Sequence, residues 1–326
     1  MEPTDVAGGR AERDGASNAM TRAGAALALL ACGLLAACGG SDGAAAIGRL
    51  DGGDTSSPYP IDRAGTGAPS TYKGLALRLV DRGVPKVDAV AGVIGVVCIG
   101  MSNAQQECAD FIRRFDAGTV AAEVRAGMRF VNCAVGSHAI ERWNDPAYDA
   151  VLWDACLNEK IPARGLRPDQ IRVVWHKAAT QFTTDANGAV LPPYPDPRSD
   201  FFRFQAELTT FADRLQARMP SVQAVYVSSR SYGGYAGTAA RGEPLSYEQG
   251  HALNQWLERR AAGGVWYGWG PYLWAPDCAT GMSNGSGVCY RRADFQADGV
   301  HPAAGALEKI STMLHERLRR EQWYRW

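Results

Sequence analysis

The chain has 326 residues, 46% of them hydrophobic, and its 34 basic and 34 acidic residues give a formal net charge of zero. This length and composition are sufficient for a substantial buried core. The balanced charge provides neither the basic surface that binds nucleic acid nor an acidic tail, so no nucleic-acid partner is expected.

Residues 1–38 are expected to be an N-terminal extension followed by an export signal. A polar stretch without pattern precedes Met20, which looks like a better translational start, and the apolar run 23–34 is too short to span a bilayer comfortably. The sequence Leu-Ala-Ala-Cys that ends at Cys38 resembles a bacterial lipoprotein signal, in which the cysteine carries the lipid. An ordinary cleaved signal peptide is the alternative. We expect an exported lipoprotein of the bacterial cell envelope, in the periplasm or at the outer membrane, held to the membrane only by this anchor.

The export signal is followed by a segment of different composition. Residues 39–71 are rich in Gly, Ala, Ser, Asp and Pro, which predicts a disordered tether. Residues 72–326 contain no internal repeat and no further boundary, and are expected to form one domain.

Export also affects the interpretation of the cysteines. Apart from Cys32 and Cys38 six remain, and an even number in an oxidising compartment predicts disulfides. Cys278 and Cys289 flank a stretch rich in Gly, Ser and Asn and are expected to pair. The other four allow three pairings, which the sequence leaves open: Cys98, Cys108, Cys133 and Cys156. Without a Cys-x-x-Cys pair or a cysteine–histidine cluster, no zinc site is expected.

From residue 86 onward, strand-like apolar runs alternate with helical patterns. The expected strands are 93–99, 129–135, 171–175, 224–227 and 265–269, and the expected helices are 102–115, 148–160, 200–219, 246–262 and 303–319. This alternation predicts parallel βαβ units in a three-layer α/β/α sandwich around a five-stranded parallel sheet. Functional groups gather at the carboxyl ends of the strands in such sheets.

The first strand leads into a candidate nucleophile. Its apolar run ends at Gly100, and Ser102 follows where the helical pattern begins. A buried strand fixes the backbone, a glycine permits a sharp exit, and the serine is then presented at the carboxyl end of the sheet. Small residues at strand ends are common, so this pattern alone is weak.

A matching acid and base lie near the other end of the chain, in Asp298-Gly-Val-His301-Pro302. His301 would take the proton of Ser102, and Asp298 would orient the imidazole. Separately, a turn aspartate and a surface histidine are the simpler interpretations. The order Ser…Asp-x-x-His across an α/β pattern favours a Ser-His-Asp triad.

An attacked ester carbonyl also needs donors for its developing negative charge. The candidates are the backbone N–H groups of Ser102 and Gly136, and a side chain that follows the third strand. Gly136 is equally well explained as a turn residue.

Together these motifs resemble the SGNH, or GDSL-type, hydrolase superfamily. Gly100-Met-Ser102-Asn103 is similar to the Gly-Gln-Ser-Asn of its sialate and carbohydrate O-acetylesterase branch. The resemblance covers about residues 93–319 and implies a flavodoxin-like sheet, no metal or other cofactor, and ester hydrolysis through an acyl-enzyme. It assigns Ser102, Asp298 and His301 to the triad and Gly136 to the second oxyanion donor.

The third motif of that superfamily is altered here. After the third strand its members carry Gly-x-Asn or Gln-Gly-Glu, whereas this chain has Trp-His176-Lys177-Ala-Ala-Thr. Lys177 is a candidate replacement donor, with a structural salt bridge as the alternative. His176 is a rival base by composition.

Four residues are candidates for binding the substrate. Asn103 belongs to the nucleophile motif, and Arg230 and Tyr232 follow the fourth strand, so they face the expected cleft. Arg230 could bind a carboxylate or phosphate, and a loop-organising ion pair is its alternative. Trp269, in an aromatic-rich stretch, is a candidate stacking surface for a sugar ring, with core packing as the alternative.

The expected function is therefore an exported serine esterase that removes acetyl or another short acyl group, with an acylated carbohydrate or another small ester as substrate. One alternative is a lipase-like or general carboxylesterase, which needs an apolar acyl groove. The other is a non-catalytic glycan-binding lipoprotein that retains the fold, for which the altered third motif is the best support.

Overall fold

A computed structural model describes residues 70–325, except 80, 121–122, 182 and 261–262. The predictions for the export signal, for Cys38 and for the tether up to residue 69 lie outside the described residues. Strand β1 starts at Ser70, inside the segment 39–71 that was expected to be a tether. Within the described residues, none of the helices has the length and apolar character needed to cross a membrane.

The centre of the fold is a five-stranded sheet in which every neighbouring pair is parallel, in the order β4-β3-β5-β6-β7. In chain order this is 2-1-3-4-5, the flavodoxin-like arrangement. The strands are β3 (Ile94–Gly100), β4 (Met128–Asn132), β5 (Ile171–Lys177), β6 (Ala224–Ser228) and β7 (Trp266–Trp269). The expected fold class is confirmed.

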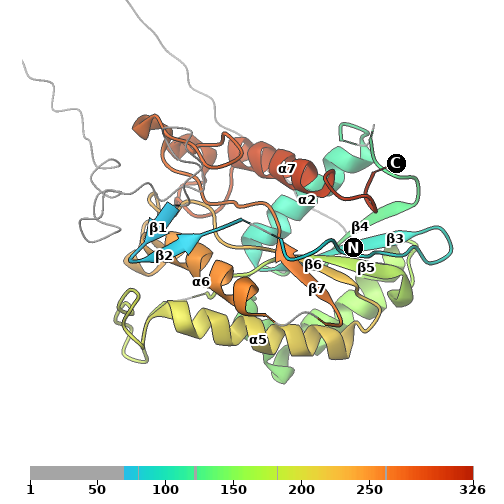
Figure 1. The fold of residues 1–326 in the computed structure, drawn as a ribbon, viewed down its shortest axis with the longest axis horizontal. Helices are drawn as coiled ribbons and strands as arrows, with labels where there is room; N and C mark the ends of the chain where they lie inside the picture. The colour runs from blue at the N-terminus through green and yellow to red at the C-terminus, as the bar shows by residue number, and fades with distance from the viewer. Residues whose placement is uncertain (1–69, 80, 121–122, 182, 261–262, 326) are drawn as a thin grey trace, which may run out of the picture. The chain divides into compact units, whose positions relative to one another are not determined.

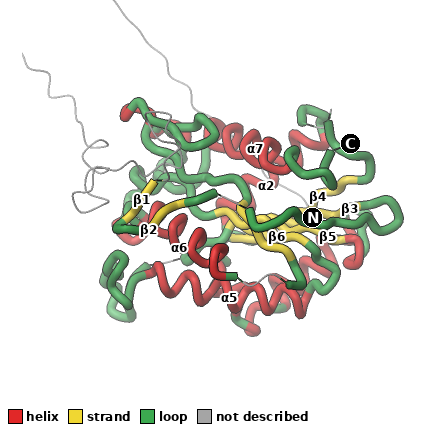
Figure 2. The backbone as a smooth tube through the Cα atoms, viewed as in Figure 1, coloured by secondary structure: helices red, strands yellow, loops and turns green. Residues whose placement is uncertain are grey.

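Helices cover both faces of this sheet (Figure 1). They are α2 (Ser102–Asp116), α3 (Ile140–Asn144), α4 (Ile161–Ala163), α5 (Asp200–Arg218), α6 (Leu245–Arg259) and α7 (Ala304–Leu318). Helices α2 and α7 pack together over one face, and α5 packs with α3 and α6 over the other. Figure 2 shows the strands enclosed between these two helical layers.

The core explains why the strands appear as unbroken apolar runs in the sequence. Every residue of β3 and β6 is buried, because both faces of the sheet are covered. Helix α2 contributes an apolar stripe at helical spacing, in which Ala104, Cys108 and Phe111 are buried.

Two segments differ from expectation. The single helix expected over 148–160 is a 3₁₀ turn, Pro146–Tyr148, followed by π-helical turns at Ala150–Asp154 and Cys156–Lys160. The second difference is an antiparallel hairpin of β1 (Ser70–Tyr72) and β2 (Leu75–Leu77), which we did not predict. Its two turn residues both have positive φ, as in a type I′ turn, but they are Lys and Gly rather than the usual Asn-Gly.

Three disulfides join the six described cysteines. Cys278 pairs with Cys289, as expected. The pairing that the sequence left open is Cys98 with Cys108 and Cys133 with Cys156. The first of these links β3 to α2 across the turn that carries Ser102.

Candidate active site

Ser102 stands on a sharp turn between β3 and α2, and Gly100 makes this turn possible. Gly100 has a φ of 149°, a conformation that disfavours any residue with a side chain. A Cβ at this position would lie 2.6 Å from the Ala104 Cβ and 2.8 Å from the Lys177 carbonyl oxygen. Only glycine lets α2 begin this close to β5, and Ser102 is its first residue.

The loop of Asp298 and His301 is held against a second loop that follows β6. Gly299 has a φ of 69°, and a Cβ there would lie 1.7 Å from the Tyr235 carbonyl oxygen. The Gly237 N–H donates to the Asp298 carbonyl oxygen at 3.2 Å. On its other side the His301 carbonyl oxygen accepts from the Gln296 N–H at 2.8 Å. The loop conformation is therefore fixed by backbone contacts on both sides.

These two segments bring the three expected catalytic side chains together. His301 Nε2 lies 2.8 Å from Ser102 Oγ, and His301 Nδ1 lies 2.5 Å from Asp298 Oδ2. Nucleophile, base and acid form a continuous hydrogen-bonded chain although serine and histidine are 199 residues apart in sequence. This is the arrangement that activates a serine hydroxyl.

The ionisation state of Asp298 determines which atom donates in the hydrogen bonds that His301 forms with Asp298 and with Ser102. Partial burial alone would raise the pKa of Asp298, but the N–H groups of His301 and Val300 and the imidazole outweigh it and lower this pKa to about 2. An ionised carboxylate only accepts hydrogen bonds, so His301 Nδ1 is the donor to Asp298. In the neutral imidazole Nε2 then accepts from Ser102, as a general base must.

Two backbone N–H groups beside Ser102 are available to an oxyanion. Hydrogen bonds to β3 continue beyond the end of β4, and the last of them runs from the Val135 N–H to the Gly100 carbonyl oxygen. Gly136 is the next residue in the chain. A Cβ on Gly136 would lie 4.0 Å from the Ser102 Cβ. Among the described residues, neither the Ser102 N–H nor the Gly136 N–H has an acceptor. The first is an unsatisfied donor of the helix start.

The third candidate donor, Lys177, forms a buried ion pair with Glu107 of α2. Burial raises the pKa of Glu107 and lowers that of Lys177, and the attraction between the two charges opposes both shifts. The structure therefore gives Lys177 the alternative role considered for it, a structural salt bridge, at the carboxyl end of β5.

His176 points to the opposite face of the sheet from Lys177, because successive side chains of a strand alternate. Its ring stacks on Phe211 of α5 at a centroid distance of 3.8 Å, and neither ring nitrogen has a partner in the described part of the chain. Burial lowers its pKa to about 3. The rival-base hypothesis for His176 is wrong, because the side chain does not reach Ser102.

Asn103 holds the two halves of the site together. Its Nδ2 donates to the Val300 carbonyl oxygen at 2.8 Å, and this residue directly precedes His301. We expected a substrate-binding role. The structure shows a positioning contact, and Asn103 also lines the adjoining pocket, so the substrate-binding role stays a prediction.

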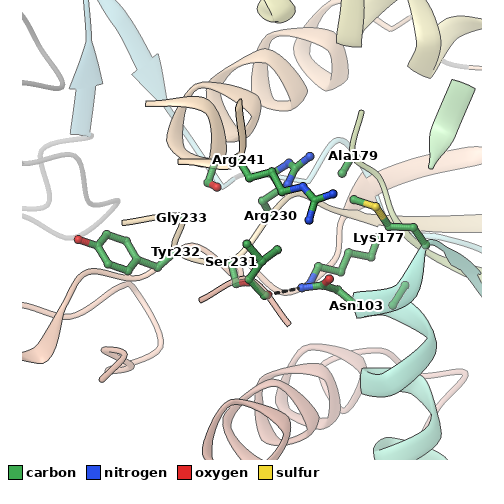
Figure 3. A pocket seen from close by; sticks show the side chains of 12 residues that line it. Asn103, Lys177, Ala179, Arg230, Ser231, Tyr232, Gly233 and Arg241 are labelled. Carbon is green, nitrogen blue, oxygen red and sulfur yellow. Dashed lines mark hydrogen bonds between the residues drawn. The ribbon is translucent and has the colours of Figure 1, made fainter. Parts of the chain in front are cut away.

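Figure 3 shows a pocket next to the segments that carry the triad. It is lined by the neighbours of Ser102, by Val300 and by the segment after β6, including Arg230 and Tyr232, two of the expected substrate contacts. Trp269 does not line it. It lies on β7, three strands from β3 and thus about 14 Å away, and its buried ring packs edge-on against Tyr272. The expected stacking surface is corrected to core packing.

Two residues of the site were not found from the sequence. Glu107 lies on the apolar stripe of α2, and a carboxylate in such a position is a signal for a buried cation partner. Arg241 also lines the pocket, but it lies in a short 3₁₀ turn far along the chain, where no pattern marks it. No group of three or more His, Cys, Asp or Glu in the described residues is arranged to hold a metal ion.

Family models and curated proteins contain no match to this chain. Several solved structures are similar. A carbohydrate esterase family 3 protein from Talaromyces cellulolyticus is 12% identical over 70% of this chain and 97% of its own, with a TM-score of 0.41. A GDSL-like lipase from Bacteroides thetaiotaomicron is 13% identical over 69% and 88%, with a TM-score of 0.39. A carbohydrate esterase family 2 enzyme from Corynascus thermopiles is 15% identical over 72% and 67%, with a TM-score of 0.37.

These overall similarities are low, and the functional conclusion rests on the geometry around Ser102. In its motifs and in the order of its strands, the chain resembles the SGNH, or GDSL-type, hydrolases.

Proposed function

We propose that the protein is a serine ester hydrolase that removes acetyl or another short acyl group, with an acylated carbohydrate as substrate. The observation that carries this proposal is the hydrogen-bonded chain of Ser102, His301 and Asp298. The backbone N–H groups of Ser102 and Gly136, which have no acceptor among the described residues, also support it.

In the proposed reaction the Ser102 Oγ attacks the ester carbonyl while His301 Nε2 accepts its proton. The Ser102 and Gly136 N–H groups stabilise the oxyanion. The imidazolium returns the proton to the leaving alcohol, the bond between carbonyl carbon and alkoxy oxygen breaks, and an acyl-serine remains. A water molecule, deprotonated by His301, then releases the carboxylic acid and regenerates Ser102.

The lining of the pocket supports a polar substrate. The hydroxyl-bearing residues Ser231, Tyr232 and Ser246 are among those that line it. The preference for a short acyl group is part of the proposal and is tested directly below.

The test is hydrolysis of p-nitrophenyl esters of increasing acyl length by the full chain and by Ser102→Ala. We expect the acetate to be hydrolysed faster than the octanoate, and the variant to lose about 10³-fold or more in kcat. A matched control is Ser137→Ala, an exposed serine next to Gly136. Mass spectrometry after reaction with a fluorophosphonate should locate the label on Ser102.

Other results point to the alternatives. A preference for octanoate would indicate a lipase-like enzyme. Equal rates for wild type and Ser102→Ala, with both proteins folded, would indicate a non-catalytic protein, and glycan binding would then be measured.

We also propose that the protein is exported and lipidated on Cys38. The three disulfides of the described residues support an oxidising compartment. Metabolic labelling with a fatty-acid probe, compared with Cys38→Ser, tests the lipid anchor. Absence of label in the wild type would refute it.

A further inference from the structure

The pocket beside the triad is lined by three basic side chains. Of the residues that line it, Lys177, Arg230 and Arg241 are basic, and no acidic residue lines it in the described part of the chain. The charge of Lys177 is balanced by Glu107. The two arginines lie on the same side of the pocket (Figure 3), close enough for the charge of Arg241 to lower the pKa of Arg230.

In the described part of the chain, Arg230 is a buried cation without an ion-pair partner. Its side chain makes two hydrogen bonds, from Nε to the Gln249 Oε1 at 3.1 Å and from one terminal nitrogen to the Thr180 carbonyl oxygen. The second terminal nitrogen has no partner among the described residues, and no described carboxylate lies within ion-pair distance. The residue is only 7% exposed.

Three acids, Asp200, Glu141 and Glu243, attract this charge without pairing with it, and Asp200 has the largest effect of the three. The carboxylate of Asp200 accepts from the Gln249 Nε2 at 2.6 Å and from the Thr180 Oγ1 at 2.9 Å, so these residues stand between it and Arg230. Burial lowers the pKa of Arg230, but a guanidinium stays charged in proteins. A buried, unpaired charge is costly, and a second guanidinium nearby adds repulsion.

We propose that this pocket binds an anionic group of the substrate, a carboxylate or a phosphate, through Arg230 with support from Arg241. This inference rests on the proposed function and specifies its substrate class. A guanidinium offers paired N–H donors that match these anions. The pocket lies next to the two segments that carry the reacting side chains, because it is lined by Met101 and Asn103, on either side of Ser102, and by Val300, which precedes His301.

The anion can belong to the acyl group or to the alcohol, and two matched substrate pairs distinguish these sources. The first pair is p-nitrophenyl hydrogen succinate and p-nitrophenyl butyrate, which have equal acyl length. The second pair is an O-acetylated hexuronic acid and the corresponding O-acetylated hexose. We expect the anionic member of one pair to have a kcat/KM about 10- to 100-fold higher, as for a charge-assisted hydrogen bond.

Arg230→Met should reduce that preference about tenfold or more, and Arg241→Met should reduce it less. The control is Arg167→Met, because Arg167 precedes β5 at the opposite end of the sheet and pairs with Asp169. It should keep the wild-type preference. If Arg230→Met fails to fold, Arg230→Lys and competitive inhibition of the wild type by succinate, hexuronate and inorganic phosphate replace it.

The outcomes separate this inference from the proposed function. Hydrolysis of the neutral and anionic members at equal rates would overturn the anion site and leave the esterase intact. No hydrolysis of any of the four esters would overturn the proposed function itself.

Discussion

Asn103 and Val300 connect the helix of the nucleophile to the loop of the base. The Asn103 amide donates to the Val300 carbonyl oxygen at 2.8 Å, one residue after Ser102 in the chain and one residue before His301. The bond thus runs beside the contact between Ser102 Oγ and His301 Nε2. It holds the backbone on both sides of the reacting pair.

Replacing Asn103 by Leu should therefore lower kcat more than it changes KM. The side chain keeps its approximate volume but loses the donor, and a small displacement of His301 is expected to reduce kcat about 10- to 100-fold. Gln106→Leu is the control, because Gln106 bonds the same loop through Gln296 at the exposed surface. Steady-state kinetics on p-nitrophenyl acetate measure both. A wild-type kcat in Asn103→Leu would show that the bond does not position the base.

Asp298→Asn should inactivate the enzyme without unfolding it. Asp298 Oδ1 accepts the N–H groups of Val300 and His301, each at 3.0 Å. The amide oxygen of asparagine can keep these bonds, which turns its NH₂ towards His301 Nδ1. The imidazole would then carry its proton on Nε2 and could not accept from Ser102. We expect a loss of about 10³- to 10⁴-fold in kcat with the melting temperature nearly unchanged. A loss below about tenfold would mean that Asp298 does not set the tautomer.

Gly100→Ala should be strongly destabilising. The methyl group would lie 2.6 Å from the Ala104 Cβ and 2.8 Å from the Lys177 carbonyl oxygen, at a φ of 149°. We expect the free energy of unfolding to fall by about 3 kcal/mol or more. Gly118→Ala is the matched control: its φ is 78°, but nothing lies within 4 Å of the added Cβ, so only the conformational cost of about 1 kcal/mol applies. Urea unfolding measures both, and equal losses would show that space at Gly100 is not limiting.

Two buried histidines should make stability depend on pH. Burial lowers the pKa of His176 and of His251 to about 3, whereas an unfolded chain protonates histidine near 6.5. Between these values the unfolded state binds more protons. The contribution of the two neutral imidazoles to the free energy of unfolding is therefore complete above about pH 6.5. As the pH falls towards 3, the free energy of unfolding decreases by about 1.4 kcal/mol per pH unit for each imidazole.

In the double variant His176→Phe, His251→Phe, the free energy of unfolding should depend less steeply on pH, because both titrating imidazoles are gone. Neither imidazole has a hydrogen-bond partner in the described part of the chain, and both rings already pack against aromatic rings. Urea unfolding between about pH 7 and pH 4 gives the free energy at each pH. An unchanged slope in the double variant would assign the dependence to other groups.

The sequence predicted the sheet well because the strands are short and mostly apolar, and burial on both faces of the sheet favours such segments. The segment from 148 to 160 is largely helical, as predicted, but most of it is π-helix, which the sequence did not indicate. Its apolar residues fit a helical period, but the disulfide from Cys156 to Cys133 and the packing of Trp153 against Trp143 are tertiary constraints that a local pattern does not contain.

The site was predictable where local chemistry marks it. Glycines at positions of positive φ, Gly100 and Gly299, accompany both catalytic segments, and the order of serine, acid and base is visible in the sequence. The roles of Lys177 and Trp269 were not predictable. The first depends on a carboxylate from another helix, and the second depends on the place of β7 at the edge of the sheet.

The separation of Ser102 and His301 by 199 residues has a consequence for biogenesis. During synthesis the nucleophile emerges long before its base, and the strands between them must pair before the two side chains can meet. A nascent or partly folded chain thus carries a serine with ordinary alcohol reactivity. Labelling of Ser102 by a fluorophosphonate would therefore report completed folding of the domain.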